Sequence, residues 1–442
     1  MKISFITNSP IRRNMIANLF GVCVQLLNQI VLVPFYILFW GNELYSDWIV
    51  ISALSTIFAM SDVGLNNVIQ NRFSIKLSEE NYEECESLLT NNYILVGITM
   101  MFTLLACGVF VGLWDITKVM SLHLLTRHEA NFVFIVLIAK VFIGMFSGIE
   151  NAIYRATHNA SISVYMDQIG NLVVALTTLL CILLKVPVAL ISMLICLPQL
   201  VLFIFKYFHS KKYYNYRFSL RSVNFYLFKS VLFPSFSFMA FPLGNTIILQ
   251  GYTLVVNSYF GANSVVLYNT TRTLCNFIKT LINTLQSAVW PEYSIAYGKS
   301  DFTLMRKLHR KILKITIVIS SLSGMGLLLF GPVIFNLWTH DSIPFSYSLM
   351  IVYVFALFIE SLWTSSSVTL MATNNHTKLG FVYILSSFIS LLLSIVIADN
   401  FTSLWMLASS LILLHFIVAF FSLREGLKLT GDSLKKILRT NE

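Results

Sequence analysis

The residues best able to bind a charged ligand form a polar stripe on one apolar segment, residues 263–289. Its six members recur at alternating steps of three and four residues: Asn269, Arg272, Asn276, Lys279, Asn283 and Gln286. On a helix they would fall within an arc of roughly 100° and rise over about 25 Å, most of a bilayer core. A charge in hydrocarbon costs at least about 2.5 kcal/mol, so Arg272 and Lys279 must face protein or water. The stripe predicts one wall of a hydrated, cationic path. A polar seam that only joins helices is the alternative.

Four amide side chains give the first apolar segment a similar but uncharged seam. Asn14, Asn18, Gln25 and Gln29 cluster within about 60° of one helical face. Amides exchange hydrogen bonds readily with the hydroxyl groups of a ligand, and they also join helices. Cavity lining and helix packing therefore remain open alternatives for this seam. Asn18, Gln25 and Gln29 are its candidates for a cavity wall.

Three more ionisable residues within the predicted spans are candidates for a function. Lys140 and Glu360 fall near the middle of spans 130–152 and 346–371, and Lys140 is a further candidate for the cavity. The two could form a state-dependent ion pair, or Glu360 could take up protons. Static buried groups are the alternative. Asp62 lies near the end of its span, where it is either a helix-end residue or a second proton carrier.

The elements that carry these residues need a membrane as their solvent. Hydrophobic residues make up 57% of the 442 residues, charged residues make up 11%, and the mean hydropathy is +0.76. These values lie far outside the range of soluble domains. The 6 cysteines and 8 histidines show no spacing typical of a disulfide framework or a metal site, so we predict no metal and no cofactor. The net charge of +10 suits anionic membrane lipids, and no motif indicates nucleic-acid binding.

Apolar stretches separated by polar breaks predict about twelve membrane-spanning helices. They lie near residues 14–40, 46–69, 89–114, 130–152, 162–184, 187–208, 230–259, 263–289, 312–338, 346–371, 378–398 and 402–423. With both termini in the cytoplasm, the outer connections hold Lys118, Arg127 and Lys185, while most of the 30 basic residues lie on the inner side. The excess of inner positive charge therefore predicts cytoplasmic termini.

The chain repeats itself weakly. At an offset of 220 residues Gly41 meets Gly261, and at an offset of 216 residues the segment 155–159 meets 371–375. About six spans per copy would give both copies the same orientation. We predict an N-terminal lobe (1–208), a basic cytoplasmic linker (209–229), a C-terminal lobe (230–423) and a basic cytoplasmic tail (424–442). Two parallel lobes around a polar midline are what alternating access requires, so a transporter is the leading class.

Motifs at the ends of two spans resemble a known family. Residues 61–65, Ser-Asp-Val-Gly-Leu, are close to the Asp-x-Gly-Leu turn of bacterial polysaccharide exporters. The stripe helix runs into residues 290–294, Trp-Pro-Glu-Tyr-Ser, and then into the polar segment 297–301. With its length and span count, the chain resembles the O-antigen flippase (Wzx-type) branch of the multidrug/oligosaccharidyl-lipid/polysaccharide exporter (MOP) superfamily.

The resemblance implies an all-α, V-shaped, MATE-like protein of the bacterial inner membrane, with two six-helix lobes and no enzymatic activity. It implies that the substrate is an undecaprenyl-pyrophosphate-linked oligosaccharide, moved from the cytoplasmic to the periplasmic leaflet. Other polysaccharide-assembly proteins are further expected partners. Members have a cationic central cavity, which Arg272 and Lys279 match in character. These cations suit the roughly two negative charges of a pyrophosphate, and the amides of the stripe suit sugar hydroxyls.

Two other functions fit a polytopic membrane protein. A multidrug or organic-cation antiporter of the same superfamily would use carboxylates in its cavity, whereas the stripe carries Arg272 and Lys279. An O-antigen polymerase or ligase would need substantial periplasmic loops and a catalytic group at an aqueous face. The predicted outer loops are short, and no pair of carboxylates or nucleophile triad lies on them. The sign of the charge and the short loops favour the flippase.

Overall fold

The fold is that of a computed structural model, which describes residues 10–120, 122, 124–219, 223–339 and 344–433, apart from some side chains within the helices. Every regular element in these residues is a helix, as the sequence predicts. Contacts divide the chain into two compact units, Met1–Ser235 (unit 1) and Phe236–Glu442 (unit 2). A helix satisfies its own backbone hydrogen bonds, which is the requirement that a bilayer places on any segment that crosses it.

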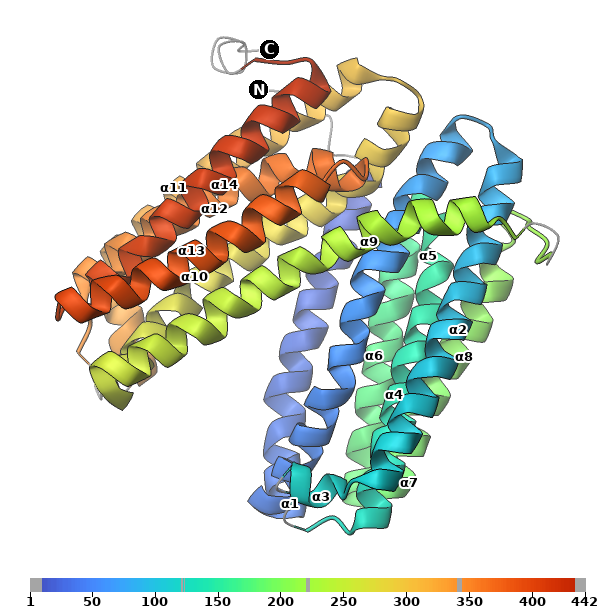
Figure 1. Cartoon of the computed structure of the whole chain (residues 1–442), viewed down its shortest axis with the longest axis horizontal. Helices are drawn as coiled ribbons and strands as arrows, with labels where there is room; N and C mark the ends of the chain where they lie inside the picture. Colours follow the sequence, from blue (N-terminus) through green and yellow to red (C-terminus); the bar gives the residue numbers. More distant parts are fainter. Residues whose placement is uncertain (1–9, 121, 123, 220–222, 340–343, 434–442) are drawn as a thin grey trace. The chain divides into compact units, whose positions relative to one another are not determined.

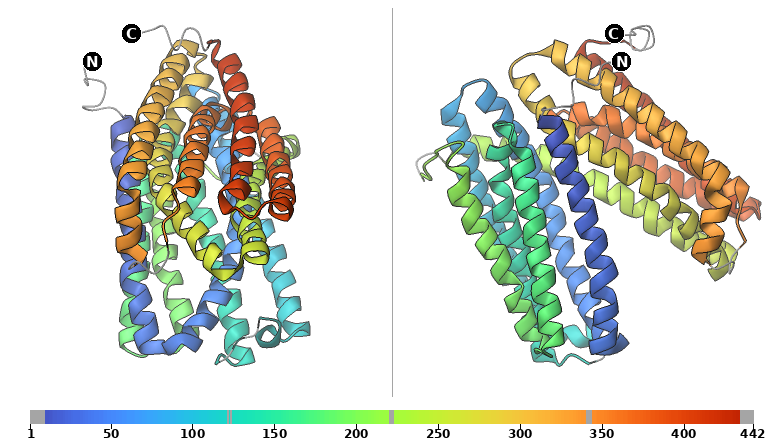
Figure 2. Two further views of the ribbon diagram at one scale, coloured as in Figure 1. Left: turned by 90° about the vertical axis from the view of Figure 1, so that its left-hand side faces the viewer. Right: turned by 180° about the vertical axis from the view of Figure 1, so that it is seen from behind.

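Unit 1 is a bundle built around α1 and α4 (Figures 1 and 2). Its helices are α1 (Pro10–Ser78), α2 (Tyr82–Leu113), α3 (Ile116–Val119), α4 (Arg127–Ile149), α5 (Asn151–Ala156), α6 (Ala160–Leu183), α7 (Val188–Leu194), α8 (Cys196–Ser210) and the first part of α9 (Phe225–Thr246). α1 packs against α2, α4, α5 and α6, and α4 packs also against α7 and α8. Thr126 and Glu129 form a capping box that fixes the start of α4.

Unit 2 is a second bundle, with α12 at its core. Its helices are the rest of α9, the π-helix η3 (Ile247–Gly251), α10 (Tyr252–Gly298), α11 (Phe302–Thr339), α12 (Tyr347–Ala372), α13 (Thr377–Asn400) and α14 (Leu404–Thr430). α12 packs against α10, α11 and α14, and its Leu349 and Met350 are fully buried in the core. α14 ends at Gly431, whose positive φ of 64° closes the helix.

Two long helices are broken at a single glycine each. Gly41 lies within the 69 residues of α1 with φ 72° and ψ 176°, and Gly261 lies within the 47 residues of α10 with φ 76° and ψ 177°. Only glycine adopts this backbone conformation without strain. The chain turns back on itself at the break in α1, as Figure 2 shows. Each of these helices therefore consists of two separate segments, as the predicted spans require.

The backbone also repeats two local turns at the predicted offsets. Glu80 before α2 has φ 60°, and Ser300 before α11, 220 positions later, has φ 55°. His158 before α6 has φ 58°, and Asn374 before α13, 216 positions later, has φ 59°. Both members of each pair share the hydrogen-bond pattern of their turn. Together with Gly41 and Gly261, these turns support the internal repeat.

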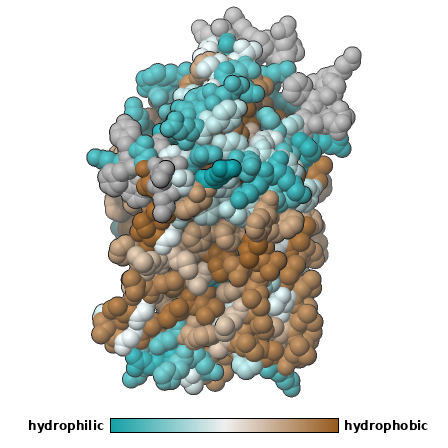
Figure 3. Space-filling view, turned by 90° about the vertical axis from the view of Figure 1, so that its right-hand side faces the viewer, coloured by the Kyte–Doolittle hydropathy of each residue, from teal (hydrophilic) through white to brown (hydrophobic). Residues whose placement is uncertain are grey.

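The surface of the helices suits a lipid environment. Among the described residues, 9 helices are long and apolar enough to cross a membrane: 82–113, 127–156, 160–183, 188–210, 229–261, 302–337, 347–372, 377–400 and 404–430. The other three predicted spans fall on α1 and the second part of α10, so the number of twelve stays a prediction. Large apolar side chains point outward on α2, where Phe102 is 63% exposed and Leu105 is 61% exposed. Figure 3 shows a broad apolar belt between polar ends on the face that it presents.

Candidate functional site

The polar stripe of α10 borders two neighbouring cavities within unit 2. The larger, of about 250 Å³, is lined by Lys279 and Gln286. The smaller, of about 50 Å³, is lined by Arg272, Asn276 and Lys279. Asn245, Lys279 and Glu360 line both cavities, so the two lie on either side of these side chains. The stripe therefore borders internal space, as a hydrated path requires.

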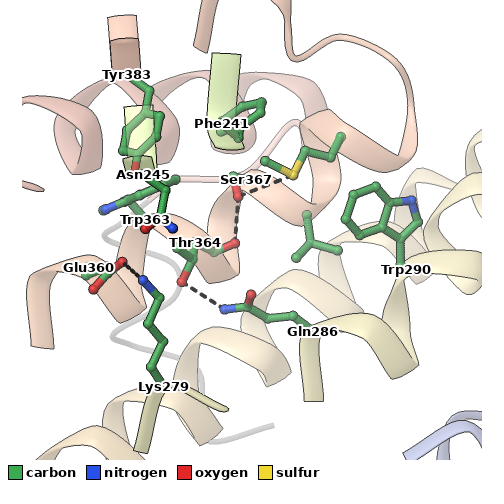
Figure 4. Close-up of a pocket in the computed structure, with 12 residues that line it drawn as sticks. Phe241, Asn245, Lys279, Gln286, Trp290, Glu360, Trp363, Thr364, Ser367 and Tyr383 are labelled. Carbon is green, nitrogen blue, oxygen red and sulfur yellow. Dashed lines mark hydrogen bonds and ion pairs between the residues drawn. The ribbon is translucent and has the colours of Figure 1, made fainter. Parts of the chain in front are cut away.

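Lys279 forms an ion pair with a carboxylate on a neighbouring helix. Its Nζ lies 2.5 Å from Oε1 of Glu360 on α12, and Figure 4 shows the two side chains meeting at the cavity. The other carboxylate oxygen lies 3.9 Å from Nε2 of His415 on α14. Trp363 Nε1 donates to His415 Nδ1 at 3.2 Å, which leaves Nε2 of a neutral His415 as the protonated nitrogen. Three helices thus hold Glu360 between two basic side chains.

Arg272 is held beside the smaller cavity by the irregular helix that precedes α10. Its Nη1 donates to the carbonyl of Leu249 at 3.1 Å, and its guanidinium lies 5.8 Å from the ring centroid of Tyr268. Leu249 belongs to the π-helix η3, whose altered hydrogen-bond pattern is often found at functional sites. Among the described residues, Arg272 has no carboxylate partner. Its other N–H groups could donate hydrogen bonds to an anion in the cavity.

Aromatic and hydroxyl side chains form the remaining walls of the larger cavity. Gln286 is 8% exposed, and its Nε2 donates to Thr364 Oγ1 at 2.9 Å and to Ser365 Oγ at 3.1 Å. The aromatic walls come from four further side chains: Phe241, Trp290, Trp363 and Tyr383. Such a mixture of rings and a few polar groups is typical of ligand-binding cavities.

Two members of the stripe, and the seam of the first span, lie elsewhere. Asn269 Oδ1 accepts a hydrogen bond from Thr253 Oγ1 at 3.3 Å, and Asn283 is exposed; neither lines the two cavities. In unit 1, Asn18 is half-buried and Gln25 is exposed, and the cavity of that unit is lined by Asn28 instead.

Lys140 lines the cavity of unit 1, and its predicted role in substrate binding stays a prediction. The side chains of Gln29 and Asp62 lie outside the described residues, so their predicted roles in the cavity and in coupling stay predictions.

Sequence patterns missed three residues that the fold brings into polar clusters. His415 and Asn28 carry no signal, because a single polar residue in an apolar helix does not disclose its neighbours. Glu150 is fully buried at the end of α4 and accepts hydrogen bonds from the hydroxyls of Tyr93, Ser210 and Tyr216. Tyr216 lies in the predicted linker, so Glu150 ties that segment to unit 1.

No group of three or more metal-binding side chains occurs in the described part of the chain.

Comparison with known proteins identifies one curated relative. No protein-family model matches the sequence. A protein of Salmonella typhi named "Putative O-antigen transporter" is 24% identical over 305 residues. The match covers 64% of this chain and 64% of the relative, which is less than two thirds of its length.

Solved transporter structures share the fold over essentially the whole chain. A mutant MATE protein has a TM-score of 0.79 at 15% identity and covers 98% of both chains. An outward-facing multidrug resistance MATE family transporter of the MOP superfamily has a TM-score of 0.78 at 16% identity, covering 100% of this chain and 99% of that one. A MOP superfamily transporter from Pyrococcus furiosus, described by the reverse polarity of its binding pocket, has a TM-score of 0.75 at 17% identity, covering 98% of both.

The chain therefore has the fold of the MATE transporters of the MOP superfamily, and the described residues include 9 helices long and apolar enough to cross a membrane. The resemblance to the O-antigen branch that its motifs indicated is confirmed by the curated relative.

Proposed function

We propose that the protein is a flippase for an undecaprenyl-pyrophosphate-linked oligosaccharide, an O-antigen repeat unit or a related glycan. It moves this substrate from the cytoplasmic to the periplasmic leaflet by alternating access. The position of Arg272 is the observation that carries the proposal, because its guanidinium borders an intramembrane cavity and has no carboxylate partner in the described part of the chain. The Salmonella typhi relative, named as an O-antigen transporter, supports the same substrate class.

The charges of the cavity suit the head group of this substrate. Arg272, Lys279 and Glu360 together carry one net positive charge, since Lys279 and Glu360 neutralise each other. A pyrophosphate could accept a forked pair of hydrogen bonds from Arg272 and compete with Glu360 for Lys279. Gln286, Thr364 and the aromatic walls could then contact sugars, whose hydroxyls need polar partners outside water.

A multidrug antiporter is less well supported by these contacts. Organic cations would need an available carboxylate, and the carboxylate of Glu360 is already bound by Lys279. Arg272 would repel a cation in the same space. An enzyme of O-antigen polymerisation or ligation has no support from the transporter fold.

The proposal also covers the arrangement of the chain in the cell. The protein would lie in the bacterial inner membrane with about twelve spans, in lobes 1–208 and 230–423 joined by the linker 209–229. Both termini and the tail 424–442 would face the cytoplasm, where basic residues meet anionic lipids. The lipid-linked oligosaccharide is the proposed ligand, and other polysaccharide-assembly proteins are proposed partners.

Complementation of a strain that lacks its own O-antigen flippase tests the proposal. Arg272→Ala should reduce surface polysaccharide at least about tenfold, because a charge-assisted contact with a phosphate contributes about 1.5–3 kcal/mol. Lys279→Ala should also reduce it, and the double variant should be inactive. Lys299→Ala, which removes an exposed cation at the end of the same helix, should keep full activity. Full activity of the double variant at normal expression would contradict the proposal.

A further inference from the structure

Unit 1 contains its own cavity, which is larger than those of unit 2. Its volume is about 580 Å³, and it lies among α1, α4, α6 and α8. The polar side chains of Asn28, Lys140, Asn171 and Gln199 line it, each from a different helix. This space is large enough for a monosaccharide, and nothing in the stripe of α10 accounts for it.

Lys140 is the charged side chain among the described residues that line this cavity. It forms no ion pair with any acidic side chain of the described residues, in contrast to Lys279. Lys140 is half-buried, and an ammonium group that has lost part of its water without gaining a counterion is destabilised, a cost that an anionic ligand would offset. The cavity is therefore electrostatically incomplete without an anion.

The other walls of the cavity suit a sugar ring. Tyr36 and Trp48 line one side and are held rigidly, since the rings of Tyr36 and Tyr45 stack at 5.0 Å and those of Trp40 and Trp48 meet edge to face at 5.7 Å. Aromatic faces contact the apolar faces of small ligands, and the amides offer both donors and acceptors to hydroxyl groups.

We propose that this cavity binds an acidic sugar of the transported glycan, with the carboxylate on Lys140 and the ring against Trp48 and Tyr36. The proposal rests on the flippase function and names a class of glycan for it: one that contains a uronate or a similar sugar acid. One flexible ammonium group matches one carboxylate, whereas a pyrophosphate carries roughly two charges and suits the forked donors of Arg272.

Saturation-transfer difference NMR on the purified full-length protein tests the site without any transport. Glucuronate and glucose are the observed probes, each added alone, and inorganic phosphate is added as a competitor. Glucuronate should receive saturation from the wild type. In Lys140→Met its signal should fall at least fivefold, while a weak glucose signal stays unchanged. Lys118→Met, which removes an exposed cation of the same unit, is the control.

The variant should fold, because it removes a half-buried charge that has no ion-pair partner among the described residues and keeps the side chain close to its original length. Asn28→Leu provides a second variant and should weaken glucuronate and glucose alike. The proposed site would be wrong if glucuronate gave no signal with the wild type. It would also be wrong if the glucuronate signal were the same with Lys140→Met as with the wild type. Displacement of glucuronate by an equal concentration of phosphate would assign the cavity to the lipid carrier and also overturn it. Uronate binding that depends on Lys140 would support the site even if the complementation test failed.

Discussion

At the residue scale, Lys279 and Glu360 compensate each other's charge. Their side chains are 29% and 14% exposed, so each charge has lost much of its contact with water. If one partner is removed, the other charge stays partly out of water with no opposite charge beside it. The fold is then destabilised by more than the intact pair stabilises it. Arg272 has no such partner, so the two cations of the stripe have different electrostatic environments.

A double-mutant cycle measures this dependence. Lys279→Met and Glu360→Gln should each lower the free energy of unfolding by about 2–3 kcal/mol, and the double variant should lose at least about 1 kcal/mol less than their sum. Denaturation of the purified protein in detergent gives these values. The pair Lys76–Glu79, at 2.9 Å and at the end of α1 outside the predicted spans, is the control and should show a coupling below about 0.5 kcal/mol. Additive effects at Lys279 and Glu360 would contradict the expected coupling.

At the scale of helices, Gly41 and Gly261 determine where α1 and α10 break. An added Cβ would meet no atom within 4 Å at either position, so space is not what requires glycine there. The backbone conformation requires glycine, because φ is +72° at Gly41 and +76° at Gly261.

Gly41→Ala and Gly261→Ala should each destabilise the protein by about 1–3 kcal/mol, owing to that conformation alone. Gly108→Ala in α2 and Gly326→Ala in α11 are matched controls, because they have open space and a helical backbone. These controls should be neutral or stabilising by up to about 1 kcal/mol. Thermal unfolding of the four variants in one detergent compares them, and equal shifts in both pairs would argue against the conformational explanation.

At the scale of the whole molecule, Glu360 is the candidate for coupling transport to protons. It contacts Lys279 of α10 and lies near His415 of α14, and Tyr383 of α13 lines the same cavity. A substrate phosphate that draws Lys279 away would leave the carboxylate free to take up a proton.

Transport by the reconstituted protein should therefore respond to an imposed pH gradient, and Glu360→Gln should reduce that response severalfold. Glu83→Gln, at an exposed position in α2, serves as the control and should respond like the wild type. Flux of a fluorescent lipid-linked oligosaccharide into vesicles is the measurement. A wild-type flux that ignores the gradient would remove the coupling hypothesis and leave the fold unaffected.

The helices and the stripe were predictable because both depend on local periodicity. Residues three and four apart share a helical face wherever the helix packs, so Arg272 and Lys279 could be placed on one side from their spacing alone. The matched glycines at 41 and 261 were visible for a similar reason, since only glycine supports the break that each helix needs.

The amino-acid sequence by itself determined the membrane class, the apolar helices, the repeated turns and the cationic face of α10, because each follows from composition or from neighbours along the chain. The tertiary structure alone decided that Lys279 meets Glu360, 81 residues away, and that Asn28, rather than Gln25, shares a cavity with Lys140. Periodicity fixes the angle of a side chain about its own helix, but only packing decides which other helix that side chain faces.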